Sequence, residues 1–207
     1  MPEKPLTLGI LASGCGTNVQ ALIDAIEIGA LSARIAVIVS NKENAPVLER
    51  AKKHGIPTFF YDPKAVDSRE AYDGLLCETL QKHQVELLVL AGYMRLLTKV
   101  LVAPFRERII NIHPSLLPAF PGLHAHKQAI DYGVKMSGCT VHFVDEKMDH
   151  GPVIAQASVP VKEDDTASSL ADRILQEEHR LFPKVIQWYA EKRLSIEGRR
   201  VLLVPES

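Results

Sequence analysis

The end of one apolar run carries an amide and an imidazole side chain that could form a polar site. Asn111 and His113 stand two positions apart where "RIINI" ends, and side chains at i and i+2 of a strand point to the same face. Pro114 follows at once and restricts His113 to extended geometry. Ligands of open α/β sheets bind at the carboxyl ends of strands, so this amide and imidazole are candidates for contact with a ligand. The alternative is a structural pair that only braces the proline-rich loop.

A second candidate is the glycine loop "SGCGTN" at residues 13–18. It lies between an apolar run and an amphipathic stretch, so its N–H groups are expected at a helix start, where they bind anions. The pattern Gly14-x-Gly16 lacks the third glycine of a dinucleotide loop, and the next strand ends in Ser40-Asn41 without an acidic residue. No lysine follows as in a Walker motif. The loop predicts a monophosphate site, or else a tight turn capped by Asn18.

Two further loops lie where strands are expected to end. In "VDEKMDHGPV", residues 144–153, Asp149 could approach a polar site or serve only as a turn residue. In "GYMRLL", residues 92–97, apolar side chains could wall a slot, with Arg95 able to meet a carboxylate. Packing of the second loop into the core is the alternative. The apolar residues of that slot are Met94, Leu96 and Leu97.

Other catalytic chemistries have weaker support in the sequence. The histidines show neither HExxH nor zinc-ribbon spacing, so a metal site is not predicted; they are His113, His124, His126, His142 and His150. A G-x-S-x-G nucleophile elbow is absent. The three cysteines, Cys15, Cys77 and Cys139, lie far apart in the sequence, which is typical of reduced thiols rather than of a disulfide framework.

Alternating apolar and amphipathic stretches must position these residues. Short apolar, β-branched runs are expected as strands at 6–12, 33–39, 58–61, 86–92 and 108–112, and the stretches between them have apolar residues at helical spacing. Ser68 is expected to cap one of these helices, and Gly29 and Gly55 are expected to end two others. This alternation predicts a parallel sheet with helices on both faces. Ligands of such sheets bind at the carboxyl ends of the strands.

The pattern changes after residue 122. The runs 138–146 and 151–161 are joined by a short polar loop and predict an antiparallel pair added to the sheet. A long helix is expected from Thr166 to about Arg193, kinked or divided at Pro183, and "RRVLLVP" is expected as a terminal strand. The predicted fold is therefore a single α/β domain over residues 1–207. Its sheet is Rossmann-like and mostly parallel, with the antiparallel pair in the C-terminal half.

The composition is typical of a soluble globular protein. Hydrophobic residues make up 46% and charged residues 24%, and the formal net charge of -1 gives no general attraction to nucleic acid or to an anionic membrane. The apolar runs are too short to span a bilayer. The opening "LTLGILASGC" could pass for a lipoprotein signal, but it leads directly into a helical pattern, and a first strand is the favoured interpretation.

Four segments resemble the formyl transferases that use 10-formyltetrahydrofolate. They are "ILASGCGTN", "AGYMRLL", "NIHPSLLPAFPGLHAHKQAI" and "GCTVHFVDEKMDHGPVIAQ". The glycine loop and the chain length make the sequence similar to the phosphoribosylglycinamide formyltransferases of purine biosynthesis. Methionyl-tRNA formyltransferases carry an added C-terminal domain and formyltetrahydrofolate hydrolases an added N-terminal domain, so both relatives are disfavoured.

The resemblance implies a role for particular residues. Asn111, His113 and Asp149 match the catalytic trio of the family. Substrate-binding positions match Gly16, Thr17 and Asn18 at the phosphate and Glu178 at the ribose hydroxyls. Folate-binding positions match Arg69, Met94, Arg95, Leu96, Leu97, Asn111, Val144 and Asp145, with the two arginines near the glutamate tail. Cys15 and His150 depart from the family pattern.

The implied reaction is direct attack of the amine of glycinamide ribonucleotide on the formyl carbon of 10-formyltetrahydrofolate, through a tetrahedral intermediate and without a metal. The implied division gives phosphate binding to residues 1–100 and catalysis and folate binding to residues 101–207. We expect a cytoplasmic monomer or homodimer whose partners are these small molecules, with no nucleic acid or membrane. Three alternatives stay open: a formyltetrahydrofolate hydrolase-like enzyme, a nucleotide-binding oxidoreductase, and a non-catalytic folate- or nucleotide-binding regulator.

Overall fold

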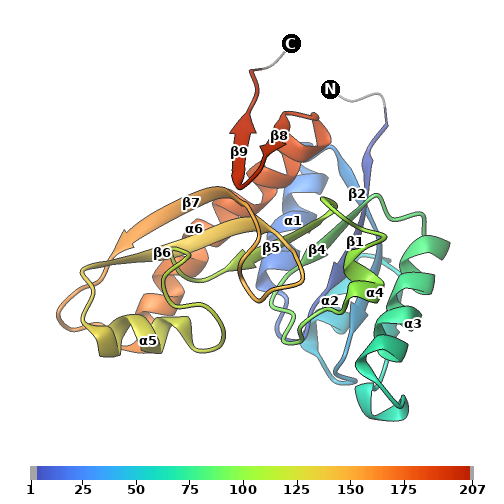
Figure 1. The fold of residues 1–207 in the computed structure, drawn as a ribbon, viewed down its shortest axis with the longest axis horizontal. Helices are drawn as coiled ribbons and strands as arrows, with labels where there is room; N and C mark the ends of the chain where they lie inside the picture. The colour runs from blue at the N-terminus through green and yellow to red at the C-terminus, as the bar shows by residue number, and fades with distance from the viewer. Residues whose placement is uncertain (1–3, 206–207) are drawn as a thin grey trace.

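A nine-stranded sheet forms the centre of the computed structural model, which describes residues 4–205 (Figure 1). Its strand order is β3-β2-β1-β4-β5-β6-β7-β9-β8. Strands β1 to β5 pair in parallel, whereas β6 pairs antiparallel with both β5 and β7. The predicted mostly parallel sheet with an added antiparallel pair is therefore confirmed. The strands are β1 (Leu6–Leu11), β2 (Ala33–Ser40), β3 (Thr58–Phe60), β4 (Leu87–Leu90), β5 (Ile109–His113), β6 (Met136–Phe143), β7 (Val153–Pro160), β8 (Leu194–Glu197) and β9 (Arg200–Leu203).

Helices cover both faces of the parallel part. One core packs the sheet against α1 (Thr17–Glu27), α2 (Pro46–Lys53) and α6 (Ala167–Ala190). The other packs it against α3 (Arg69–Lys82) and α4 (Lys99–Val102). Successive residues of β2 alternate between the two: Ile38 belongs to the first core, and Val37 and Val39 belong to the second. This two-sided burial explains the continuous apolar run. A short 3-10 helix, η1 (Pro63–Ala65), follows β3.

The strand order creates the crevice where the site lies. Strand β1 has β2 on one side and β4 on the other, so the chain changes direction along the sheet at β1. The loops that follow neighbouring strands on opposite sides of such a point diverge and leave a crevice at the carboxyl edge. Helix α5 (Ala125–Tyr132) lies beyond β5 and packs with α6 over β6 and β7. The loops after β1, β4 and β5 therefore open onto one edge.

The helix ends follow the sequence signals. Ser68 Oγ accepts a hydrogen bond from the backbone N–H of Ala71 at 3.0 Å, so it caps α3 as predicted. Gly29 and Gly55 have φ of 74° and 67° where α1 and α2 end, a conformation that glycine adopts without steric cost. Within residues 4–205, no helix is both long enough and apolar enough to cross a membrane.

The C-terminal part corrects two predictions. Helix α6 continues from Ala167 to Ala190, so Pro183 does not divide it. Proline costs one backbone hydrogen bond there, but its neighbours Phe182, Val185 and Ile186 are fully buried and hold the helix in place. The helix also ends before residue 193.

The chain then forms a hairpin where one terminal strand was expected. Strands β8 and β9 pair antiparallel around the turn Gly198–Arg199. The sequence patterns assigned no element to residues 194–197, which form β8. Such short strands give too few alternating residues to be separated from a helix end.

Candidate active site

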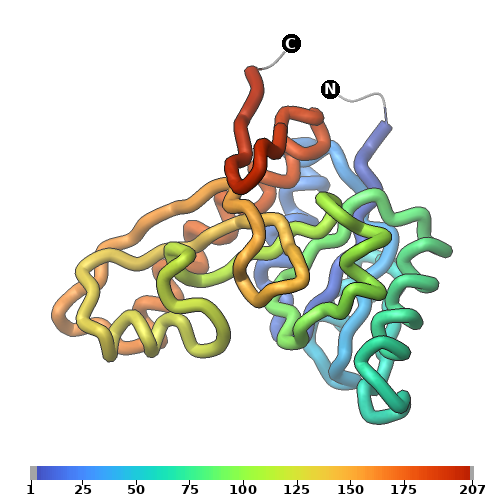
Figure 2. Tube along the Cα trace, in the orientation of Figure 1, coloured from blue at the N-terminus to red at the C-terminus, as the bar shows by residue number. Residues whose placement is uncertain are grey.

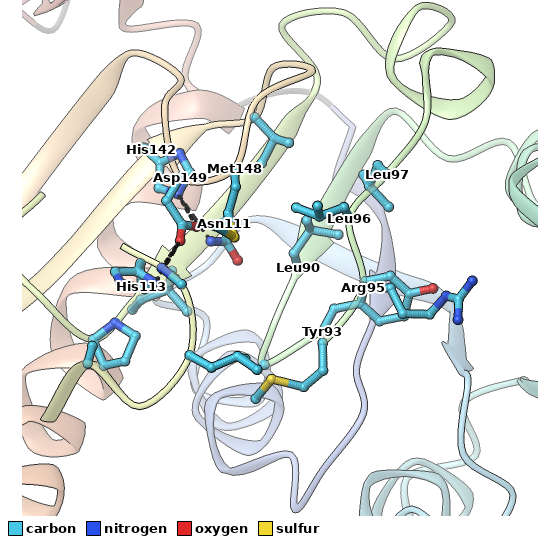
Figure 3. Close-up of a pocket in the computed structure, with 18 of the residues that line it drawn as sticks. Leu90, Tyr93, Arg95, Leu96, Leu97, Asn111, His113, His142, Met148 and Asp149 are labelled. Carbon is cyan, nitrogen blue, oxygen red and sulfur yellow. Dashed lines mark hydrogen bonds and ion pairs between the residues drawn. The ribbon is translucent and has the colours of Figure 1, made fainter. Parts of the chain in front are cut away.

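A pocket of about 500 Å³ opens at the carboxyl ends of β4 and β5 (Figure 3). Its walls come from residues 90 and 92–97 at the end of β4 and beyond, 111–114 at the end of β5, 122–126 at the start of α5, and 142 and 144–149 at the end of β6 and beyond. Asn111, His113 and Asp149 all line it. The structure therefore brings together the three polar residues that the sequence separates into two loops.

His113 has an oxygen acceptor at each ring nitrogen. Its Nε2 lies 3.0 Å from the carbonyl oxygen of Phe120, and its Nδ1 lies 3.5 Å from Oδ2 of Asp149. Both contacts are satisfied only when both nitrogens carry hydrogen, as in the imidazolium form. Asp149 Oδ2 also accepts a hydrogen bond from the backbone N–H of Gly122 at 2.8 Å. This contact fixes the carboxylate opposite the ring.

Asn111 is held by a residue that sequence reasoning missed, His142. The Nδ2 of Asn111 lies 3.1 Å from Nε2 of His142, and Nδ1 of His142 lies 2.8 Å from the carbonyl oxygen of Phe143. Nδ1 must donate to that carbonyl, so Nε2 is the acceptor of the amide hydrogen. Burial lowers the pKa of His142 and favours this neutral form. A polar residue inside the apolar run "TVHFV" was the available signal.

The glycine loop begins α1, as the sequence predicts. Helix α1 starts at Thr17, with Gly16 before it at φ 72°. A side chain at Gly16 would also place its Cβ only 2.5 Å from Cγ2 of Val47 and 3.1 Å from the Val47 backbone. Glycine is therefore required there by both conformation and space. The N–H groups at this helix start can bind an anion.

Two polar residues that the sequence did not single out connect this loop to its neighbours. Ser13 Oγ donates to Oδ1 of Asn41 at 2.6 Å and accepts from the backbone N–H of Met94 at 2.9 Å. Ser13 follows β1, Asn41 follows β2 and Met94 follows β4. One hydroxyl therefore links the glycine loop to the rim of the pocket.

Glu178 reaches the glycine loop from α6. Its Oε2 accepts a hydrogen bond from Nδ2 of Asn18 at 2.7 Å, and only 6% of its surface is exposed. Burial raises the pKa of Glu178 to about 7, although the Asn18 hydrogen bond opposes this change. A buried carboxyl group with a raised pKa beside a predicted anion site makes Glu178 a candidate functional residue.

The residues expected at folate fall into two groups. Met94 and Leu96 are 60% and 51% exposed at the pocket rim, and Leu97 is buried in its wall. Val144 and Asp145 also line the pocket. Arg95 lies over the ring of Tyr72, with 4.7 Å between Cζ and the ring centroid, and extends away from the polar trio in Figure 3.

Arg69 is outside the pocket wall. Its Nη2 donates to the carbonyl oxygen of Leu96 at 2.9 Å, so it braces the 92–97 loop from outside. Arg69 therefore lies on the outer side of this loop, whereas Arg95 also lines the pocket. Any contact of Arg69 with a ligand would involve a tail that extends out of the pocket.

In the part of the chain covered by the structure, no group of three or more His, Cys, Asp or Glu side chains could hold a metal ion, and metal independence stays a prediction.

Known proteins resemble this chain over nearly its whole length. The family model described as formyl transferase matches residues 7–186. Phosphoribosylglycinamide formyltransferase of Escherichia coli (strain K12) is 42% identical over 191 residues, which cover 92% of this chain and 90% of that protein. The crystal structure of glycinamide ribonucleotide transformylase 1 from Symbiobacterium toebii is 51% identical with a TM-score of 0.96, covering 97% of this chain and 95% of that one. The trifunctional purine biosynthetic protein adenosine-3 of Drosophila melanogaster is 47% identical over 188 residues, which are 90% of this chain but 14% of that protein.

Glu178→Gln should stabilise the protein at alkaline pH. Since burial raises the pKa of Glu178 to about 7 from 4.5, the folded state holds a proton that the unfolded state loses. The contribution of Glu178 to the free energy of unfolding is therefore fully present below pH 4.5 and is lost as the pH rises through about 7, a change on the order of 3 kcal/mol. Glutamine cannot ionise, and its amide oxygen can still accept from Asn18. We expect urea unfolding to show a gain for the variant at pH 8 that nearly vanishes at pH 5.

The matched control for this measurement is Glu177→Gln on the same helix. Glu177 is more exposed and pairs with Arg180 at 3.0 Å, so its replacement should give no gain that grows with pH. An equal gain at pH 8 for both variants would contradict the assignment to Glu178.

Cys15 should be the first thiol to react with iodoacetamide. It is exposed in the glycine loop just before α1, whereas burial raises the pKa of Cys77 and raises that of Cys139 to about 12. The thiolate is the nucleophile, so both other cysteines should react slowly. Peptide mapping after partial alkylation checks the order. Modification of Cys77 or Cys139 before Cys15 would show the prediction to be wrong.

Proposed function

This chain belongs to the formyl transferase family, and we propose that it transfers the formyl group of 10-formyltetrahydrofolate to the amino group of glycinamide ribonucleotide in purine biosynthesis. The observation that carries this proposal is the meeting of Asn111, His113 and Asp149 in one pocket. The glycine loop linked to its rim supplies a place for the substrate phosphate. The proposal includes two small-molecule partners and no metal, nucleic acid or membrane, for a cytoplasmic monomer or homodimer.

The proposed chemistry needs donors for a developing oxyanion. The amine of glycinamide ribonucleotide attacks the formyl carbon, and the formyl oxygen gains negative charge as the tetrahedral intermediate forms. Nδ2 of Asn111 has a second hydrogen that the His142 contact does not use. A protonated His113 supplies the other donor once the formyl oxygen replaces the Phe120 carbonyl at Nε2. Donors that are fixed before the reaction lower the barrier because they need no reorganisation.

Asp149 favours the charged state of His113 and helps to move the proton that the amine loses. Its Oδ2 lies 3.5 Å from Nδ1 of the ring, and an opposite charge at this range favours the imidazolium. The collapse of the intermediate returns a proton to the leaving nitrogen of the folate. The carboxylate and the imidazole therefore act as one unit in the proposal.

The two substrates occupy different parts of the crevice in this proposal. The phosphate lies on the N–H groups of Gly16, Thr17 and Asn18 at the start of α1, and Glu178 accepts from the ribose hydroxyls. The folate ring system lies in the pocket against the 92–97 and 144–149 loops, with its glutamate tail directed toward Arg69 and Arg95. The hydrogen bonds of Ser13 to Asn41 and Met94 fix these two parts of the crevice relative to each other.

An assay of tetrahydrofolate release tests the proposed function. Purified protein is mixed with 10-formyltetrahydrofolate with and without glycinamide ribonucleotide, and the change in folate absorbance is followed. We expect release that depends on the amine substrate. Release with water alone would indicate a hydrolase, and tight binding of NAD by fluorescence titration would indicate an oxidoreductase.

The losses of activity caused by His113→Ala and Asp149→Asn should not be additive. Each single change should lower kcat by about 10²- to 10⁴-fold, the usual range for general acid–base and oxyanion groups. Because the two side chains act as a unit, adding Asp149→Asn to His113→Ala should cost much less than it costs in the unmodified protein. Single-turnover kinetics of the four proteins measure this coupling. Additive losses would leave Asp149 as a turn residue only.

A further inference from the structure

Two polar side chains close the base of the loop between β6 and β7. Asp145 stands near its beginning and His150 near its end, and Nδ1 of His150 lies 2.8 Å from Oδ2 of Asp145. The other carboxylate oxygen of Asp145 accepts from the backbone N–H of Lys147 at 2.9 Å. Residues 144–150, here called the β6–β7 loop, are therefore closed on themselves by polar contacts.

Arg199 in the turn between β8 and β9 holds this closure from outside. Its Nη2 donates to the carbonyl oxygen of His150 at 2.7 Å. Its Nη1 lies 3.4 Å from Nδ1 and 3.3 Å from Nε2 of the same residue. These nearly equal distances place Nη1 over the ring face, since an approach in the ring plane would collide with Cε1. A guanidinium group both stacks on rings and donates to carbonyls.

The position of Arg199 is set by the hairpin. Gly198 has φ 62° at the first position of a two-residue turn, which suits glycine. Strand β9 also pairs with β7 where that strand begins, at Val153 opposite Arg200. Figure 2 shows the tip of this red hairpin at the base of the orange β6–β7 loop.

The β6–β7 loop carries residues for both folate binding and catalysis in the proposed reaction. Asp145 and Met148 line the pocket, and Asp149 faces His113. Asp149 has φ 49°, a left-handed conformation that needs support from its surroundings. Burial would raise the pKa of Asp145, but the His150 hydrogen bond, the Lys147 N–H and nearby positive charge together lower it. Asp145 is therefore a stable anionic anchor for the closure.

We propose that Arg199 is a positioning residue for folate binding. It contacts His150, and His150 in turn contacts Asp145. These contacts hold the β6–β7 loop in the conformation that lines the pocket. His150, which departs from the family pattern, acquires a role as the link between the hairpin and the loop. The inference rests on the proposed function only for the identity of the ligand as a formyl folate.

Loss of Arg199 should weaken folate binding more than catalysis. Without Arg199, the loop adopts its binding conformation in only a fraction of the molecules. The apparent affinity for folate falls in proportion to that fraction. Arg199→Ala should therefore raise the KM for 10-formyltetrahydrofolate roughly fivefold to tenfold. The KM for glycinamide ribonucleotide and the kcat at saturation should change less than about twofold, because bound folate restores the loop. Arg199→Lys should lie between, since lysine keeps a donor but cannot stack.

Arg200→Ala is the matched control, because it removes the same charge one position along β9. It should leave every kinetic constant unchanged. His150→Ala should reproduce the folate effect, and His150→Asn should recover part of it, because the asparagine amide can donate to Asp145. An unchanged KM for folate in Arg199→Ala, an equal effect of Arg200→Ala, or a loss confined to kcat would each overturn the proposal.

Hydrogen exchange gives a readout that is independent of activity. In the unliganded protein, Arg199→Ala should speed exchange at the N–H groups of Lys147 and Gly122, whose acceptors belong to the β6–β7 loop, while β4 and β5 stay protected. Unaltered exchange in the loop would also overturn the proposal. If the unmodified protein transferred no formyl group, the proposed function would fail, yet this exchange experiment would still decide whether Arg199 holds the loop.

Discussion

The antiparallel register between β5 and β6 is the constraint on which the site depends. It places Asn111 opposite His142 and His113 opposite Thr140, so both chemical side chains have a polar partner across the strand. Thr140 Oγ1 donates to the carbonyl oxygen of Ser115 at 2.6 Å and accepts from the N–H of Leu117 at 3.0 Å. A slip of one residue would send all these side chains to the other face of the sheet. The register therefore fixes the amide, the imidazole and the proline-rich loop in one step.

The same register gives the two histidines of the site different hydrogen-bond partners. His142 is enclosed by apolar strands, donates to one carbonyl and accepts from one amide, and burial lowers its pKa. His113 is also buried, but a carbonyl and a carboxylate face its two nitrogens. His142 can serve as a neutral acceptor that orients Asn111. The carboxylate of Asp149 lies between the two rings, with Oδ2 3.5 Å from Nδ1 of His113 and Oδ1 3.9 Å from Nε2 of His142.

Sequence patterns predicted the features of this arrangement that depend on residues close together in the chain. The strand and helix periods, the glycine loop at a helix start and the Asn111–His113 spacing all follow from neighbours in the chain. His142, Ser13, Asn41 and Arg199 could not be found in this way, because their meaning comes from partners on other strands. Glu178 entered only through the family resemblance, since its partner Asn18 lies 160 residues away. The hairpin was missed because its strands are too short to show a period of their own.

Strained backbone conformations also occur around the pocket, and polar contacts stabilise them. Phe120, His124 and Asp149 all have positive φ, which is uncommon outside glycine, and they occur in the two loops that meet over the pocket. Phe120 presents its carbonyl to His113, and Asp149 accepts from Gly122, so each loop is held by a group of the site itself. A substrate that takes the His113 hydrogen bond removes one of these supports, while the strands beneath stay fixed. The loops can therefore adjust around a ligand, and the donors that act on it remain in place because the β5–β6 register, not the loops, positions them.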